Sequence, residues 1–372
     1  MAKATVVRTV RLPAFVIPGL LVIACALLST LGSEVLQRET TTMLVYVVIV
    51  VGLQIFVGNS GVLSFGHMGF VMIAAYTTAI LTISPEQKRF LLPDLPDRLG
   101  NTELSLVPAV LVAAGLAAAF GLVIAIPLMR LDGLAAAIAM LAVLLIVYTV
   151  VANWDSFTSG RSTMIGVPTD TTLTRACVFA CLAIVLAHLY RRSRWGLRLR
   201  AARDDPPAAA ASGVNVVRER QVALVVSAFV VGMGGFLYAQ FLGAFNPEAF
   251  FFDLTFLTIA MLVVGGVESI AGAVVGTVVV SAANAGLLRV EDGMALGPLD
   301  IPERPGLTQA GVAVLLIVIL VFRSKGLTRG REFEPRVPRD PDQLVRRARA
   351  LVHGALRPPR GWRLPRRRDS NA

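Results

Sequence analysis

Few residues of this 372-residue chain could form a catalytic or metal-binding group. Its histidines and cysteines are isolated from one another: they are His67, His188, His353, Cys25, Cys177 and Cys181. No glycine-rich turn leads into Gly-Lys-Ser/Thr, so the chain has no Walker A loop, and neither HExxH nor GxSxG occurs. We therefore expect no catalytic residue, no metal site and no bound cofactor, and an enzyme is the least favoured class.

Residues 58–70 instead place polar side chains among glycines, with no charged residue nearby. The polar members are Asn59, Ser60, Ser64 and His67. Glycines permit a broken helix or a close helix approach, and amide, hydroxyl and imidazole groups can hydrogen-bond a small solute. These four residues are therefore candidates for lining a solute path. The alternative is a short turn followed by a small-residue packing face.

Residues 200–215 are typical of a short, capped helix. Charged residues precede Pro206-Pro207, four alanines and a terminal glycine. An aspartate can cap such a helix, proline suits its first position, and glycine suits its end. The helix would present a small, flat face to a partner's groove, and the alternative is an ordinary surface helix. The candidate docking residues are Arg203, Asp204, Asp205, Ala208, Ala209 and Gly213.

A third stretch consists of residues 245–253 followed by residues 264–276, and its second part contains Gly272 and Gly276 one helical turn apart. Small residues at this spacing let two helices approach closely, so we favour a packing role.

Long apolar runs must position these stretches. The chain is 55% hydrophobic and 16% charged, with a mean hydropathy of +0.71, whereas soluble domains carry roughly 25% charged residues. Most of the runs are long enough to cross about 30 Å of hydrocarbon as helices. They are residues 14–31, 42–57, 62–83, 106–129, 133–152, 172–190, 221–243, 254–266, 270–288 and 307–322. The sequence thus predicts an all-α, polytopic membrane protein with about ten transmembrane helices.

Two of these assignments have alternatives. Residues 254–288 allow one long kinked helix or two helices that turn at 265–269. Glu268 favours the turn, because a carboxylate at mid-bilayer is costly. The first run follows three basic residues, which also suits a cleaved signal peptide, but its length favours an uncleaved span.

The net charge of +11 is concentrated in one tail. Residues 323–372 carry 15 basic and 5 acidic residues, whereas the rest carries 20 basic and 19 acidic residues. A nucleic-acid-binding surface is therefore not indicated. Eight arginines lie between Arg191 and Arg220, so this loop is the firmest cytoplasmic assignment. With ten spans, both termini are then cytoplasmic.

We divide the chain into a transmembrane domain, residues 1–329, with its cytoplasmic loop at 191–220, and an Arg/Pro-rich cytoplasmic tail, residues 330–372. Most of the tail is expected to lack fixed structure. Residues 343–356 could form a basic amphipathic helix on anionic lipid, or remain solvated. Loops 84–105, 153–171 and 289–306 should hold short interfacial helices or ordered turns.

These stretches, in this order, resemble the LivH/LivM family, the inner-membrane permeases of ABC importers for branched-chain amino acids, and the LivM branch is the more similar. The resemblance covers about residues 40–328. It is carried by residues 58–70, Ala75-Tyr76, 131–134, 153–160, 166–168, Trp195-Gly196, 202–205, 213–215, 246–248, Gly265-Gly266 and 322–327.

The resemblance implies a type II ABC-importer fold that works by alternating access. The implied partners are a LivH-like second permease, two cytoplasmic ATPases that hydrolyse the ATP, and an extracytoplasmic solute-binding protein, all at the inner membrane. It also implies that residues 200–215 dock on the ATPase. The implied cargo is a branched-chain amino acid or a similar small polar solute.

The chain departs from the family's pattern at Pro206-Pro207, at Ala210 or Ala211, where Glu is common, and at Glu268, where relatives mostly have Gly. Two other functions stay open. One is a permease of the same family for urea or short amides. The other is an ATP-independent channel or a membrane scaffold that holds a partner through the basic tail, and neither would need an ATPase-docking helix.

Overall fold

The structure is a computed structural model that describes residues 9–11, 13–291, 295–296, 299–300, 306–323, 326–330, 332 and 336–338. Contacts divide the chain into two units, Ala14–Phe333 and the combination of Met1–Pro13 with Glu334–Ala372. In the second unit, β1 (Thr9–Arg11) pairs antiparallel with β4 (Arg336–Pro338). The candidate amphipathic segment 343–356 lies outside the described residues.

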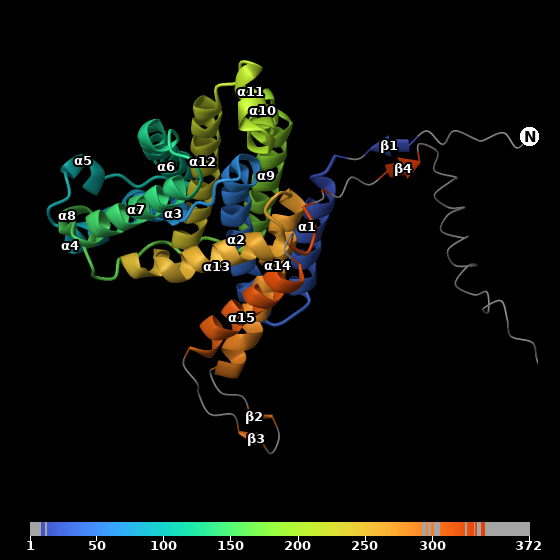
Figure 1. The fold of residues 1–372 in the computed structure, drawn as a ribbon. Coiled ribbons are helices and arrows are strands. Elements are labelled where there is room, and N and C mark those ends of the chain that lie inside the picture. Colours follow the sequence, from blue (N-terminus) through green and yellow to red (C-terminus); the bar gives the residue numbers. More distant parts are fainter. Residues whose placement is uncertain are drawn as a thin grey trace, which may run out of the picture. The chain divides into compact units, whose positions relative to one another are not determined.

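Helices make up almost all of the first unit (Figure 1). Their bounds are α1 (Val16–Thr30), α2 (Glu34–Ser60), α3 (His67–Thr82), α4 (Pro85–Leu91), α5 (Asp97–Gly100), α6 (Leu106–Leu128), α7 (Gly133–Ala152), α8 (Asp155–Thr158), α9 (Leu173–Arg192), α10 (Arg194–Asp204), α11 (Pro206–Ala211), α12 (Val216–Leu242), the 3-10 helix η1 (Pro247–Phe250), α13 (Phe252–Gly265), α14 (Ile270–Glu291) and α15 (Leu307–Phe322). Two short strands, β2 (Ala295–Leu296) and β3 (Leu299–Asp300), pair antiparallel between α14 and α15.

Each of the ten predicted apolar runs contains a helix, which confirms the helical class. Among the described residues, seven helices are long and apolar enough to cross a membrane, or eight if the bent pair α3 and α4 forms one span. The apolar helices α1 and α15 have 15 and 16 residues and would reach only about 22–24 Å. The chain is a multi-pass membrane protein, while the count of about ten spans stays a prediction.

The core is centred on α2 and α12, which pack along each other. In α2, every residue from Met43 to Ser60 except Tyr46 is buried. Helix α2 also contacts α9 and α14, and α12 also contacts α3 and α6. A helix surrounded in this way must be apolar on all sides, which explains why the run shows no polar face.

The region between residues 254 and 288 forms two helices, α13 and α14, as the position of Glu268 predicted. The turn between them includes Gly266 at φ +117°. The two helices pack on each other through glycines: a Cβ on Gly265 would overlap the backbone of Gly272, and one on Gly276 would overlap the Met261 carbonyl oxygen. The packing interpretation of Gly272 and Gly276 is therefore confirmed.

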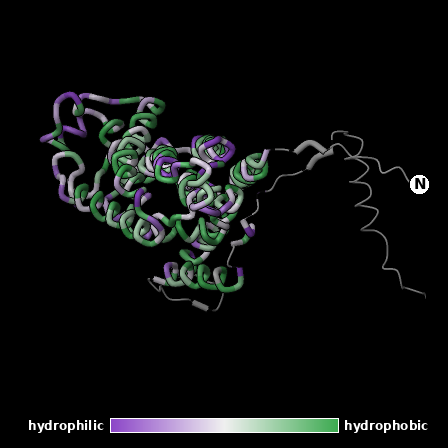
Figure 2. Tube along the Cα trace, turned by 45° about the horizontal axis from the view of Figure 1, so that its top comes forward, coloured by the Kyte–Doolittle hydropathy of each residue, from purple (hydrophilic) through white to green (hydrophobic). Residues whose placement is uncertain are grey.

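Two of the loops contain short helices, as predicted: α4 and α5 lie within 84–105, and α8 lies within 153–171. Lys88 is buried and donates from Nζ to the carbonyl oxygens of Leu99 and Thr102, which ties α4 to α5 and to the segment after it. Figure 2 shows hydrophobic residues along most of the helices and hydrophilic residues gathered in connecting loops.

Candidate functional site

The docking segment, residues 200–215, is built around the short helix α11. Asp205 caps its N-terminus, where the carboxylate Oδ1 accepts a hydrogen bond from the amide N–H of Ala208 at 3.0 Å. Gly213, at φ +81°, ends it, and Val214 N–H donates to Ala209 O at 3.0 Å. This bond belongs to a Schellman motif, which needs a left-handed residue that glycine provides at no steric cost. The predicted cap and stop are both confirmed.

The exposed face of α11 consists of small side chains. Ala208, Ala210 and Ala211 are exposed, whereas Ala209 is buried against the chain. The aspartates Asp204 and Asp205 are exposed beside them. In Figure 1, α11 lies beyond the upper end of α12, next to α10. A partner could therefore approach this face closely.

Arg203 points back into the chain and not toward the exposed face. Its guanidinium donates to the Gly58 carbonyl oxygen at 2.8 Å and pairs with the Glu268 carboxylate at 3.1 Å. Its stem lies over Gly61, where a Cβ would come within 2.8 Å of Arg203 Cγ. Gly61 also has φ +73° and forms the C-cap of α2. Arg203 therefore holds the docking segment to the end of α2 and to the α13–α14 turn.

Three further residues extend this contact into a charged cluster, which we define as Arg191, Arg200, Arg203, Glu268 and Glu332. Arg191 pairs with Glu332 at 3.0 Å and donates to the Glu268 carbonyl oxygen. Arg200 donates to the Arg191 carbonyl oxygen at 3.1 Å. Burial, together with the like charges of Arg191 and Arg203, lowers the pKa of Arg200, and the Glu332 carboxylate partly offsets this.

Glu332 has a second contact that the sequence does not suggest. Its carboxylate accepts the Ile270 N–H at 2.8 Å, at the start of α14. A carboxylate is favourable there because the first amides of a helix lack internal partners and carry partial positive charge. The charged cluster thus joins α9, α10, the α13–α14 turn and the segment after α15.

The predicted solute-path residues lie at the break between α2 and α3, and all four are buried. The Ser227 hydroxyl, on α12, donates to Gly52 O at 2.6 Å, so His67 Nε2 donates to Ser227 Oγ at 2.8 Å. In the neutral ring, Nδ1 then accepts from the Ser64 hydroxyl at 2.6 Å. This hydrogen-bonded chain ties the break to α2 and α12.

The two other path candidates bond to their own helix. Asn59 donates to Ile55 O at 2.8 Å, and Ser60 donates to Phe56 O at 2.7 Å. Ser227 was missed at the sequence level, although a lone serine in the apolar run 221–243 is a signal that could have found it. A path-lining role for Asn59, Ser60, Ser64 and His67 stays a prediction.

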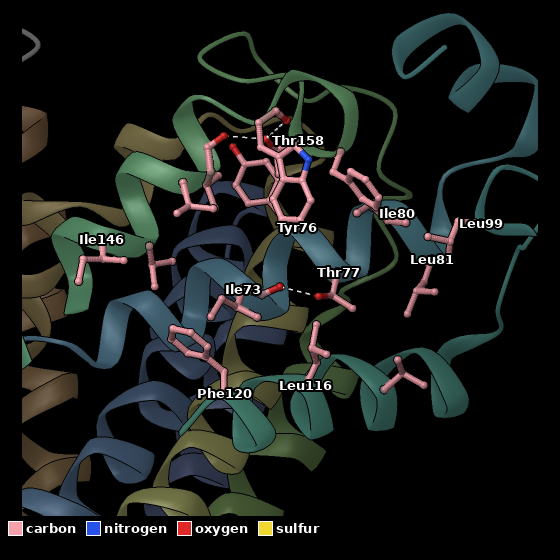
Figure 3. Close-up of a pocket in the computed structure, with 16 residues that line it drawn as sticks. Ile73, Tyr76, Thr77, Ile80, Leu81, Leu99, Leu116, Phe120, Ile146 and Thr158 are labelled. Carbon is pink, nitrogen blue, oxygen red and sulfur yellow. Dashed lines mark hydrogen bonds between the residues drawn. The ribbon is translucent and has the colours of Figure 1, made fainter. Parts of the chain in front are cut away.

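Two cavities lie elsewhere in the bundle, and none of the four path candidates lines either one. The apolar cavity, between α3, α6, α7 and α8, has a volume of about 560 Å³ (Figure 3). Aliphatic and aromatic side chains such as Ile73, Leu116 and Phe120 line it. The mixed cavity, between α2, α12, α13, α14 and α15, has a volume of about 550 Å³.

Comparison with known proteins places this architecture in a family. Residues 36–323 match the family described as branched-chain amino acid transport system / permease component. This chain belongs to that family of transport permeases.

Individual relatives agree with this assignment. The high-affinity branched-chain amino acid transport system permease protein LivM of Escherichia coli (strain K12) is 26% identical over 295 residues, which cover 70% of this chain and 65% of that protein. The corresponding LivH protein of the same organism is 31% identical over 137 residues, 37% of this chain and 42% of that protein. The nucleoside ABC transporter permease protein NupC of Lactococcus lactis subsp. cremoris (strain MG1363) is 29% identical over 150 residues, 39% of this chain and 46% of that protein.

The similarity extends over more of the chain for LivM than for LivH, which confirms the predicted LivM type. The match spans just under two thirds of the length of the Escherichia coli LivM protein. No solved structure is significantly similar to the chain.

Proposed function

We propose that this chain is one permease subunit of an ATP-driven importer for branched-chain amino acids or similar small polar solutes. Its partners in this proposal are a LivH-like second permease, two cytoplasmic ATPases and an extracytoplasmic solute-binding protein at the inner membrane. Family membership supports the permease role, and similarity to both LivM and LivH supports a permease pair.

The observation that carries the coupling role is the docking segment. Its exposed alanine face is preorganised by the Asp205 cap and the Gly213 stop, so little order remains to be acquired on binding. Eight arginines between Arg191 and Arg220 support a cytoplasmic position for it. The ATPase subunits would therefore meet α11.

The mechanism in this proposal is alternating access. ATP binding favours the closed arrangement of the two ATPases. The permease state that binds this closed arrangement more tightly is then favoured as well. Movement of α11 is passed to α10 and through Arg203 to the end of α2 and to the α13–α14 turn. The break between α2 and α3 lies directly beyond the contact of Arg203 with Gly58. The charged cluster therefore connects movement of α11 to this break.

The test is a substitution that fills the docking face. The exposed Ala210→Arg places a long cation on the face, and the exposed Thr163→Arg in the loop before α9 is the matched control. The complex is purified in mild detergent through a tag on this chain, and ATP-driven leucine uptake is measured in proteoliposomes. We expect Ala210→Arg to remove the ATPase subunits and the uptake, whereas Thr163→Arg leaves both unchanged.

Two outcomes would contradict the proposal. Normal uptake by Ala210→Arg would show that α11 is not the docking site. Recovery of the unsubstituted chain without any ATPase would favour the channel or scaffold function.

A further inference from the structure

The loop at 191–220 gathers arginines around one tryptophan, where α9, α10 and α12 meet. The guanidinium groups of Arg194 and Arg218 each lie 5.5 Å from the ring centroid of Trp195. The two charges thus share one aromatic ring, although they are 24 positions apart in sequence. Two further arginines lie close to this pair along the chain. We define the basic patch as Arg192, Arg194, Trp195, Arg198 and Arg218.

The charges of the basic patch are exposed and only partly neutralised. All four of its arginines are exposed. Arg198 pairs with the buried Glu219 at 3.7 Å, and the same carboxylate also interacts electrostatically with Arg194 and Arg218. The side chains of Arg192, Arg194 and Arg218 form no ion pair with any residue that the structure describes. One carboxylate thus faces several cations, which favours an anionic ligand.

The basic patch lies where an apolar face of α9 ends. Leu182 and Leu189 are exposed on α9, and the helical period places Arg192 on the same face. Leu197 of α10 is also exposed. The Trp195 ring is half-buried against the core, and tryptophan is enriched at the boundary between membrane and water. An exposed apolar face that ends at arginines matches hydrocarbon followed by lipid headgroups.

We propose that the basic patch binds an anionic phospholipid of the cytoplasmic leaflet. Arg194 and Arg218 donate to the phosphate oxygens, because the planar guanidinium fork suits phosphate. Leu189 and Leu197 contact the acyl chains. A zwitterionic lipid is disfavoured, because its ammonium group meets the same cations. A free anion is disfavoured as well, because it leaves both leucines in water.

The basic patch adjoins the charged cluster. Arg191 directly precedes Arg192 and pairs with Glu332 at 3.0 Å. Helix α10 begins at Arg194 and ends at Asp204, where the docking helix follows. A lipid held by the basic patch therefore anchors the junction of α9 and α10, from which the docking segment extends.

The test uses Trp195 as a fluorescent reporter in the full chain, together with the subunits that co-purify with it. Trp154→Phe and Trp362→Phe leave Trp195 as the single tryptophan. The protein is placed in phosphatidylcholine bilayers that contain a minor fraction of phosphatidylglycerol, and the acyl chains of one lipid or the other are brominated to quench the fluorescence. We expect brominated phosphatidylglycerol to quench Trp195 more than its mole fraction predicts. High salt should reduce this excess, because it screens exposed charges.

Single substitutions then separate loss of charge from loss of folding. Arg194→Gln and Arg218→Gln should each lower the preference for phosphatidylglycerol about fivefold, as for one cation at an anionic surface. Arg194→Lys keeps the charge and should keep most of the preference. The matched control is Arg38→Gln, because Arg38 is an exposed arginine 5.7 Å from the Phe241 ring and lies outside the basic patch. It should leave the preference unchanged.

Four outcomes would overturn the inference. They are equal quenching by the two brominated lipids, and a preference that survives Arg194→Gln combined with Arg218→Gln. The third is loss of the preference on adding inorganic phosphate at constant ionic strength, which would assign the basic patch to a free anion. The fourth is release of ATPase subunits by Arg194→Gln with the lipid preference intact, which would make it a protein interface. Recovery of the chain without ATPases contradicts only the proposed function, because the quenching needs neither ATP nor transport.

Discussion

At the scale of single residues, the polar groups near the α2–α3 break hold helices together. His67 joins Ser64 in the break to Ser227 on α12, and Ser227 in turn bonds the backbone of α2 at Gly52. Each of these groups is buried. Leaving a buried donor or acceptor without a hydrogen bond costs more free energy than forming the bond gains. The break is thus positioned by side chains from three segments.

Ser227→Ala tests this arrangement. It leaves the buried His67 Nε2–H without its described partner, so we expect a loss of about 1–3 kcal/mol in the free energy of unfolding. The matched control is Ser281→Ala, because the buried Ser281 hydroxyl has no hydrogen-bond partner among the described residues. The measurement is reversible unfolding in mixed micelles. Equal effects of the two substitutions would contradict the structural role of Ser227.

The contacts of Arg203 lead to a second prediction at this scale. Its guanidinium reaches a carbonyl and a carboxylate together, and the single ammonium of lysine cannot reproduce that fork. Arg203→Lys should therefore lower leucine uptake per ATP hydrolysed, by about tenfold if one charge-assisted bond is lost. Arg198→Lys, whose contact with Glu219 is longer at 3.7 Å, is the control and should change little. If leucine uptake per ATP hydrolysed is unchanged in Arg203→Lys, the charged cluster takes no part in coupling.

At the scale of elements, the α13–α14 hairpin shows how glycine sets the distance between helices. Its glycines allow the two backbones to touch, and the turn carries Glu268 to the charged cluster. The hairpin therefore places one end at the docking segment and the other at the mixed cavity.

Gly276→Ala should push the two helices of this hairpin, α13 and α14, apart. Its Cβ would overlap the Met261 carbonyl oxygen and the Gly265 backbone, so backbone has to move, and we expect at least about 1–3 kcal/mol of destabilisation, as for overpacking. Gly286→Ala on the same helix has nothing within 4 Å of its Cβ and should stabilise α14 by up to about 1 kcal/mol. Thermal unfolding of the two variants in detergent, with opposite shifts, checks this prediction.

At the scale of the whole molecule, the helical unit continues beyond α15. Glu332 lies within Ala14–Phe333 and contacts both Arg191 and the start of α14. The predicted tail begins at residue 330 and therefore includes Glu332, which makes these contacts within the helical unit. Assembly of the docking segment depends on a contact between residues 62 positions apart in sequence.

Glu332→Ala should loosen the cytoplasmic end of the proposed transporter. Loss of a mostly buried charged partner is expected to cost about 1–3 kcal/mol, and faster hydrogen exchange should follow at the start of α14 and in α10. Glu39→Ala, which breaks the more exposed pair with Arg289, is the control and should cost at most about 1 kcal/mol. If exchange in α10 is unchanged in Glu332→Ala, the charged cluster does not hold the docking segment.

The sequence alone determined the elements, because the signals for them are local. Apolar runs, an aspartate cap before Pro206, the Gly213 stop and the Glu268 turn each act within a few residues, and each of the ten predicted apolar runs contains a helix. Only the tertiary structure decided the partners: that Arg203 turns inward to Gly58, that Ser227 bonds His67, and that Glu332 reaches Ile270. The physical reason is that these bonds join residues 62 to 160 positions apart, and helix packing, which has no counterpart in local spacing, brings them together.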